Sequence, residues 1–220
     1  MPRLRADAMI PGILEQYREM YPHVAVELQD GTTDVFQQLL SEKKVDMYFG
    51  VNVEPGPNEI RIPLVEEEIW ACVSRTFRPD VFSEKTERDY PGSRPDIRSL
   101  PDLPLLVTLP SNRIRRQLDQ YYMEGGVRPF ICFEANSQPL LFELARRGMG
   151  LAVLSPAVLY HNRQAAGQMI SFPVSHTLRK SALSLVYRRD DPMPRYARDF
   201  IDIAGEVFRV YKDSLHFSEE

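Results

Sequence analysis

The chain has 220 residues, a formal net charge of −4 and a hydrophobic fraction of 43%. This length suits one large domain or two small ones. The acidic balance argues against a surface that grips a nucleic-acid backbone, and no stretch reaches the roughly 18 apolar residues of a membrane span. The first ten residues lack the apolar core of a secretory signal, which predicts a cytoplasmic protein.

The first part of the chain alternates between helix and strand patterns. Apolar residues at helical spacing predict a helix over about 9–21, and alternating Val24, Val26 and Leu28 predict a strand. A second amphipathic pattern over about 33–44 precedes the apolar run Val45–Val51, which predicts a strand buried on both faces. This order indicates α/β units with a largely parallel sheet.

Two short strands are predicted next, over 60–65 and 69–73, with Glu66, Glu67 and Glu68 between them. We interpret the glutamates as a solvated hairpin turn. The alternative is a metal site, but three consecutive carboxylates on a strand cannot all face one ion. Residues 74–102 are rich in proline and charge, and we expect them to form a long surface connection.

The rest of the chain predicts a second α/β lobe and a final helix. Strands are predicted over 103–109, 129–133 and 149–154, and helices over about 113–123 and 138–147. Asn136 or Ser137 is expected to cap the second helix, and Gly148 to end it. A short helix, two strands, a long amphipathic helix and a frayed tail are then predicted over 157–161, 169–174, 183–187, 196–211 and 214–220.

Three loops share one chemistry, because each is a short polar turn that leads into a helix start. They are Gly31–Thr33, Pro110–Asn112 and Ala135–Ser137. In open α/β sheets such starts lie at the carboxyl ends of strands, where ligands bind, and helix N-termini favour anions. The alternative is that each loop only caps its helix, which is worth about 1 kcal/mol.

Arginines near these loops could bind a carboxylate or a phosphate. Arg3 and Arg5 precede the first helix, and Arg113 follows the second loop. Solvent exposure is the alternative for them, and it is our expectation for Arg115 and Arg116.

Catalytic and metal sites find little support. Motifs of serine hydrolases, zinc proteases, P-loops and dinucleotide-binding folds are absent from the sequence, although folding could still assemble a triad. Cys72 and Cys132 are expected to be buried free thiols, with a disulfide or a reactive thiol as alternatives. The two cysteines and four histidines have no zinc-binding spacing, so we expect no metal and no cofactor.

The chain resembles the effector-binding domain of LysR-type bacterial transcriptional regulators. The resemblance rests on I-P-G-I-L-E-Q-Y-R-E-M-Y-P, V-A-V-E-L-Q-D-G-T-T-D-V-F-Q-Q-L-L, V-D-M-Y-F-G-V, I-R-I-P-L-V-E-E-E-I-W-A-C-V, F-E-A-N-S-Q-P-L-L-F-E-L-A-R-R-G-M-G-L-A-V-L-S-P and the final L-V-Y-R-R…F-I-D-I-A. These segments occur in the family's order over nearly the whole chain.

The resemblance implies a fold like type 2 periplasmic binding proteins, with two α/β lobes built on mixed sheets and joined by two crossover strands. It places lobe I at 1–72 and 181–220, lobe II at 73–180, and the effector in the cleft between them. The implied effector-binding residues are Arg3, Arg5, Thr32, Thr33, Ser111, Asn112, Asn136 and Ser137. It also implies a homodimer or tetramer. The family's N-terminal winged helix-turn-helix and the first strand of lobe I have no counterpart in this sequence.

We therefore expect a non-enzymatic sensor of a small anionic or carboxylate effector, which would reach DNA only through an additional N-terminal domain. Two alternatives stay open. One is a free-standing solute-binding protein of the same fold. The other is an enzyme on this scaffold.

Overall fold

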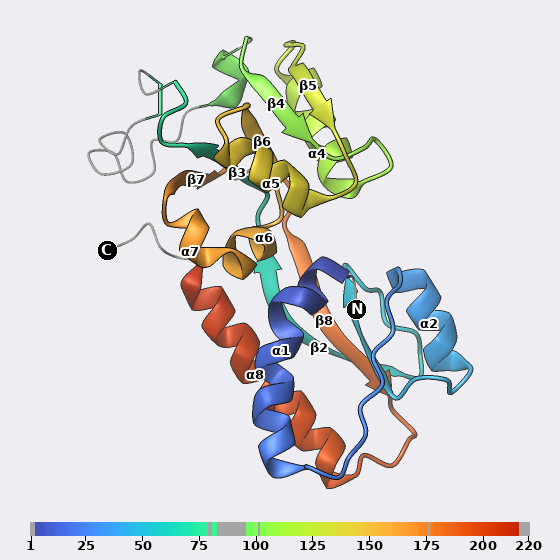
Figure 1. Ribbon diagram of the computed structural model, residues 1–220. Coiled ribbons are helices and arrows are strands. Elements are labelled where there is room, and N and C mark those ends of the chain that lie inside the picture. Colours follow the sequence, from blue (N-terminus) through green and yellow to red (C-terminus); the bar gives the residue numbers. More distant parts are fainter. Residues whose placement is uncertain (1–2, 79–80, 83–95, 101, 176, 216–220) are drawn as a thin grey trace. The chain divides into compact units, whose positions relative to one another are not determined.

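The computed structural model of the chain divides into two compact units (Figure 1). It describes residues 3–78, 81–82, 96–100, 102–175 and 177–215. Unit 1 holds the residues through Glu67 and those from Ser181 to the end of the last helix, and unit 2 holds Glu68–Lys180. The resemblance places the first lobe boundary after residue 72, a few residues beyond the division after Glu67, and the second at the same residue, Ser181. The predicted lobe boundaries stay a prediction.

Unit 1 is a small sheet flanked by helices. Its elements are α1 (Arg3–Met20), α2 (Thr33–Ser41), β1 (Met47–Val51), β2 (Glu59–Glu67), β8 (Ser181–Arg188) and α8 (Arg195–Ser214). The strand order is β1-β8-β2, and β8 is antiparallel to both neighbours. The predicted parallel sheet is therefore wrong for the described part of this unit, because the returning strand β8 separates β1 from β2.

The core of unit 1 lies between the sheet and the paired helices α1 and α8. Helical spacing places Met9, Ile13 and Tyr17 on one buried face of α1. The Tyr17 ring packs edge-on against Phe200 of α8 with centroids 5.3 Å apart, and Phe49 of β1 contacts Phe208 at 5.9 Å. These aromatic contacts fix α1 and α8 against β1.

The strand predicted at Val24–Leu28 is wrong. These residues form an extended segment that belongs to neither sheet, and Val24, Val26 and Leu28 are 36%, 40% and 55% exposed. The sequence has the alternation of a strand, but a strand forms only with a partner, and the described sheet of unit 1 stops at β1.

Unit 2 is a five-stranded mixed sheet covered by helices. Its strands are β3 (Trp70–Ser74), β4 (Pro104–Val107), β5 (Phe130–Glu134), β6 (Leu151–Leu154) and β7 (Met169–Pro173). Its helices are η1 (Ile97–Ser99), α4 (Arg113–Glu124), α5 (Gln138–Arg146), α6 (Pro156–His161) and α7 (Arg163–Ala166). The order is β5-β4-β6-β3-β7, with β4 parallel to β5 and β6, and β3 antiparallel to β6 and β7. The mixed α/β class predicted from the resemblance is confirmed.

The centre of the unit 2 sheet is fully buried. All four residues of β6 have 0% exposure, as expected for a strand covered on both faces. Gly148 ends α5 with a φ of +77°, as predicted. Gly150 has a φ of +155°, and a Cβ there would lie 2.4 Å from the carbonyl oxygen of Pro104. Only glycine lets the chain enter β6 this close to β4.

The hairpin predicted around Glu66–Glu68 is wrong. β2 pairs with β8, whereas β3 pairs with β6 and β7, so the glutamates lie where the chain passes from one sheet to the other. Glu67 is 1% exposed, and Glu68 forms an ion pair with Lys180 at 3.6 Å. The described residues contain no group of His, Cys, Asp and Glu side chains that could hold a metal ion.

The predicted surface connection at 74–102 lies largely outside the described residues. Of its described part, Phe82 and Ile97 are buried in the unit 2 core. The predicted tail lies outside the described residues from position 216 onward. None of the described helices has the length and apolarity needed to cross a membrane.

Candidate functional site

The polar loops of unit 2 follow neighbouring parallel strands. β4 and β5 run in register with Val107 opposite Glu134, and the N–H of Ala135 donates to the carbonyl of Val107 at 3.1 Å. The loops after these strands therefore lie together at one edge of the sheet, at the carboxyl ends of the strands. This is the position where open α/β sheets bind ligands.

Asn112 and Ser111 form the first of these loops. Asn112 is the N-cap of α4, and its Oδ1 accepts a hydrogen bond from the N–H of Ile114 at 2.9 Å. Ser111 is exposed, and its carbonyl accepts a hydrogen bond from Arg116. The side-chain oxygen of Asn112 is thus engaged with its own helix, while Ser111 is an exposed residue.

The second loop starts α5. Of the two caps that the sequence allowed, Ser137 is the one that forms, because its Oγ accepts from the N–H of Leu140 at 3.3 Å. Asn136 is exposed just before it. The carboxamide of Asn136 therefore lies at the helix start without being the cap.

Arg115 connects the two loops of unit 2. Its guanidinium donates to the carbonyl of Thr108 at 3.2 Å, to Asp119 at 2.7 Å and to the carboxylate of Glu134. Arg115 is 9% exposed, so the solvent exposure expected for it is wrong, whereas the same expectation for Arg116 is confirmed. Helical periodicity cannot reveal such a residue, because two of its partners, Thr108 and Glu134, lie outside α4.

Thr32 and Thr33 occupy the corresponding helix start in unit 1. Thr32 is exposed at the N-cap of α2, where it makes no side-chain capping bond. The hydroxyl of Thr33 accepts a hydrogen bond from the N–H of Val51 at 3.2 Å, at the end of β1. Thr33 therefore ties the start of α2 to a strand end.

Arg5 is neither exposed to solvent nor available as a free cation for a ligand. Arg5 is 9% exposed and forms an ion pair with Glu67, whose other oxygen accepts a hydrogen bond from the Tyr211 hydroxyl at 2.8 Å. The Arg5 guanidinium therefore joins α1 to β2 and α8. Arg3 begins α1, and its side chain lies outside the described residues.

Sequence reasoning missed three further polar groups beside the unit 2 loops. The side-chain oxygen of Gln138 accepts from the N–H of Ser155 at 2.8 Å, and Ser155 caps α6 at the end of the parallel strand β6. The buried hydroxyl of Thr108 has no hydrogen-bond partner among the described residues. The polar residue directly after the predicted strand 149–154 was a signal that could have identified Ser155, whereas Thr108 lies inside the strand predicted over 103–109.

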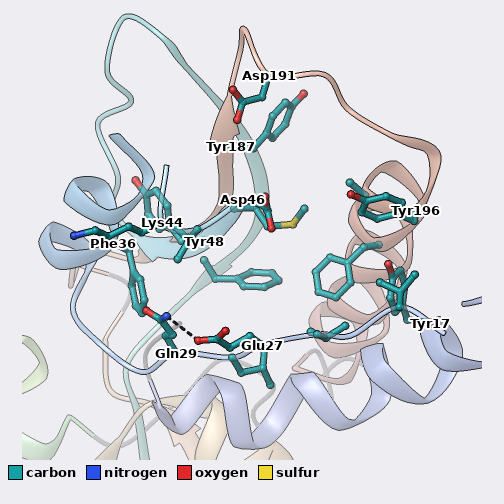
Figure 2. Close-up of a pocket in the computed structure, with 18 of the residues that line it drawn as sticks. Tyr17, Glu27, Gln29, Phe36, Lys44, Asp46, Tyr48, Tyr187, Asp191 and Tyr196 are labelled. Atoms are coloured by element: carbon teal, nitrogen blue, oxygen red, sulfur yellow. Dashed lines mark hydrogen bonds between the residues drawn. The ribbon is translucent and has the colours of Figure 1, made fainter. Parts of the chain in front are cut away.

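Unit 1 also contains a pocket of about 520 Å³, which Figure 2 shows in close-up. It is lined by α1, α8, β1 and the extended segment around Glu27 and Gln29. Thr32 and Thr33 are not among its described lining residues. The pocket is therefore distinct from the predicted effector-binding residues.

The cysteines behave differently from one another. Cys72 is buried, and burial raises the pKa of its thiol far above the ordinary value. Cys132 is exposed, so the expected burial is wrong for this residue, although both are free thiols as predicted. Burial also raises the pKa of Cys132, which disfavours the reactive thiolate.

The helix starts of unit 2 thus offer hydroxyl, carboxamide and backbone N–H groups at one sheet edge. Such groups hold a small anion by hydrogen bonds and helix-end charge. A comparison with known families gives a match to the model described as "LysR substrate binding domain" over residues 2–209.

Curated relatives are transcriptional regulators. The HTH-type transcriptional regulator CzcR of Bacillus anthracis is 24% identical over 201 residues, which cover 91% of this chain and 64% of that protein. The HTH-type transcriptional activator CmpR of Synechocystis sp. is 20% identical over 146 residues, covering 66% of this chain and 45% of that protein. The chain therefore spans less than two thirds of the length of these relatives.

Solved structures share the fold. The CcmR regulatory domain of Synechocystis PCC6803, solved in complex with 2-PG, superposes with a TM-score of 0.69 at 16% identity over 93% of both chains. The full-length BenM E226K mutant gives a TM-score of 0.68 at 15% identity, covering 96% of this chain and 66% of that one.

Proposed function

This chain belongs to the LysR substrate binding domain family, and on that basis we propose that it senses a small-molecule effector within a bacterial transcriptional regulator. Binding would favour one of two arrangements of the protein and so change the activity of an attached DNA-binding part. The HTH-type names of the relatives support this role over a free-standing solute-binding protein. A regulator of DNA would act in the cytoplasm.

The observation that carries the proposal is the paired helix starts at one edge of the unit 2 sheet. Ser111 and Asn136 are exposed beside N-termini whose N–H groups point out of the helix. Neither side chain caps its own helix, so both remain able to bind a ligand. Asn112 and Ser137 contribute mainly through the backbone, since their oxygens already accept from Ile114 and Leu140.

We propose a small carboxylate or phosphate ester as the effector, because partial positive charge at helix starts favours anions. The 2-PG in the CcmR structure is a ligand of that protein and a reasonable first probe here. Thr32 and Thr33 belong to the other unit and are retained as proposed effector contacts, to be tested by their own variants. Arg5 is left out, because Glu67 occupies its guanidinium.

We also propose that the domain forms homodimers. Unit 2 exposes apolar side chains on β5, on α5 and just after α5, with Phe130 at 53%, Leu140 at 43% and Met149 at 51%. Where such side chains form one contiguous apolar patch, the patch is typical of an association surface. Light scattering of the purified chain tests this directly, and Phe130→Ser should shift a dimer toward monomer.

A thermal-shift screen with small organic acids and phosphate esters, 2-PG included, tests the sensing role. At least one compound should raise the melting temperature in a concentration-dependent way, since a ligand that binds only the folded state stabilises it. The proposal fails if no compound stabilises the chain, or if a compound that binds is converted to product.

A further inference from the structure

Gln138, the first residue of α5, ties that helix start to a strand of the unit 2 sheet. Its side-chain oxygen accepts a hydrogen bond from the backbone N–H of Ser155 at 2.8 Å. Ser155 directly follows β6, and β4 is parallel to both β5 and β6. The carboxyl ends of these three strands therefore meet at one edge of the sheet, and the carboxamide of Gln138 lies at that edge.

The bond to Ser155 fixes the orientation of this carboxamide. A backbone N–H can bond only to the carboxamide oxygen, so the other terminal atom is the NH2 nitrogen. That nitrogen has no hydrogen-bond partner among the described residues. Gln138 is half-buried, and its nitrogen is not sealed in the core of the described chain. The NH2 group is therefore a fixed donor that a ligand can reach.

The backbone of α5 offers few donors of its own at this place. A helix leaves its first four N–H groups without helical partners. In α5, Pro139 has no N–H, and the N–H of Leu140 donates to the Ser137 hydroxyl at 3.3 Å. The N–H of Leu141 donates to the Ser137 carbonyl at 3.2 Å. Of these described groups only the Gln138 N–H is left, so an anion here needs a side-chain donor beside it.

We propose that Gln138 is a specificity-determining residue of the effector site and that its NH2 group donates to a carboxylate or phosphate of the effector. This inference rests on the proposed function, which places an anion at the same sheet edge. Because the Gln138 oxygen is already used by Ser155, the side chain offers a donor and no free acceptor carrying a backbone-independent role. It therefore favours an ionised acid, which only accepts, over an amine or an amide N–H, which needs an acceptor.

A purely structural role for Gln138 would be to hold Ser155 in place, and two variants separate the roles. Gln138→Glu keeps an oxygen for the Ser155 N–H and replaces the NH2 group by a second oxygen. Gln138→Met removes both groups at similar length. The proposal expects anion binding roughly tenfold weaker or more in both variants, and weakest in Gln138→Glu. A structural role alone predicts that only Gln138→Met weakens binding.

The contact itself is tested by NMR of the full nitrogen-15-labelled chain, titrated separately with inorganic phosphate and with acetate at neutral pH. The side-chain NH2 signals of Gln138 are identified by their absence in Gln138→Glu. They should shift in a saturable way, with the same apparent Kd as the backbone amides of Ser111 and Asn136. Gln120 is the control, because its side-chain nitrogen already donates to Glu124 at 2.8 Å. Its NH2 signals should stay in place.

Two results would overturn the proposal, and they differ in what else they affect. If the Ser111 and Asn136 amides shift while the Gln138 NH2 signals stay in place, Gln138 does not contact the anion, and the proposed effector site stands without it. If neither anion moves any of these signals, the anion site at this sheet edge fails as well. Binding by Gln138→Glu as tight as in the unaltered chain would also overturn the role of the NH2 group.

Discussion

Arg5 of α1 and Glu67 at the end of β2 form an ion pair in which both residues are buried, at 9% and 1% exposure. The Tyr211 hydroxyl of α8 binds the second carboxylate oxygen. Three elements of unit 1 are thereby joined at the residue where the chain leaves for unit 2. Removing one partner of such a pair leaves a buried charge without compensation.

Glu67→Gln should therefore lower the free energy of unfolding by about 3 to 5 kcal/mol, because Arg5 stays buried and charged. Tyr211→Phe is the matched variant. It removes one hydrogen bond and should cost about 1 to 2 kcal/mol. Urea denaturation measures both. Equal and small losses would show that the Arg5–Glu67 pair is not held in a buried position.

Arg115→Met should reduce both stability and effector affinity. The variant leaves the Thr108 carbonyl and the Glu134 carboxylate without their shared donor, at a cost of about 1 to 3 kcal/mol. The two loops of unit 2 would no longer be held together. Gln120→Met on the exposed side of α4 is the control and should change neither quantity. Intact affinity in Arg115→Met would show that the loops are positioned by other contacts.

The stability of unit 2 should depend on Asp96 at acidic pH. Hydrogen bonding from the Arg98 side chain lowers the pKa of Asp96 to about 2, against about 4 in an unfolded chain. A lowered folded-state pKa stabilises the fold above pH 4, and this contribution disappears as the pH falls from about 4 toward 2. The Asp96 side chain is 45% exposed, so the effect should not exceed about 1 kcal/mol.

Asp96→Asn abolishes this titration. Unfolding free energies of the two proteins should differ at pH 6 and converge near pH 2. A difference in unfolding free energy that is the same at pH 6 and at pH 2 would contradict the lowered pKa of Asp96.

The thiols should differ in reactivity toward a disulfide reagent such as DTNB. One thiol per chain should react in the folded protein, and slowly at neutral pH, because burial raises the pKa of Cys132. Cys72 should react only after denaturation. Cys132→Ser should abolish the native reaction. Two equivalents reacting under native conditions would show that the β3 region opens readily.

Sequence patterns predicted most helices and strands of this fold because their signals are local. Ile13 and Tyr17 recur at helical spacing, and Gly148 ends α5 in the conformation that glycine favours. The errors concern partners that lie far away in the sequence. Val24–Leu28 has the alternation of a strand without a described neighbour, and Glu67, predicted to be solvated, is buried in an ion pair with Arg5.

For the candidate site too, local signals could be predicted from the sequence and distant partners could not. Helix-start chemistry located Ser111, Asn112, Asn136 and Ser137, and the structure brings them to one sheet edge. Sequence could not show which oxygens are already used for capping. It also could not show that Arg115 links both loops, because the partner Glu134 belongs to another strand.

Isothermal titration with an acid found in the thermal-shift screen tests the sensing role most directly. Ser111→Ala should weaken binding about tenfold, the equivalent of one charge-assisted hydrogen bond of roughly 1.4 kcal/mol. Thr33→Val in unit 1 should weaken it by a similar factor if Thr33 binds the effector. Ser41→Ala, exposed at the end of α2, is the control. Affinities equal to that of the unaltered chain in both Ser111→Ala and Thr33→Val would contradict the proposed site.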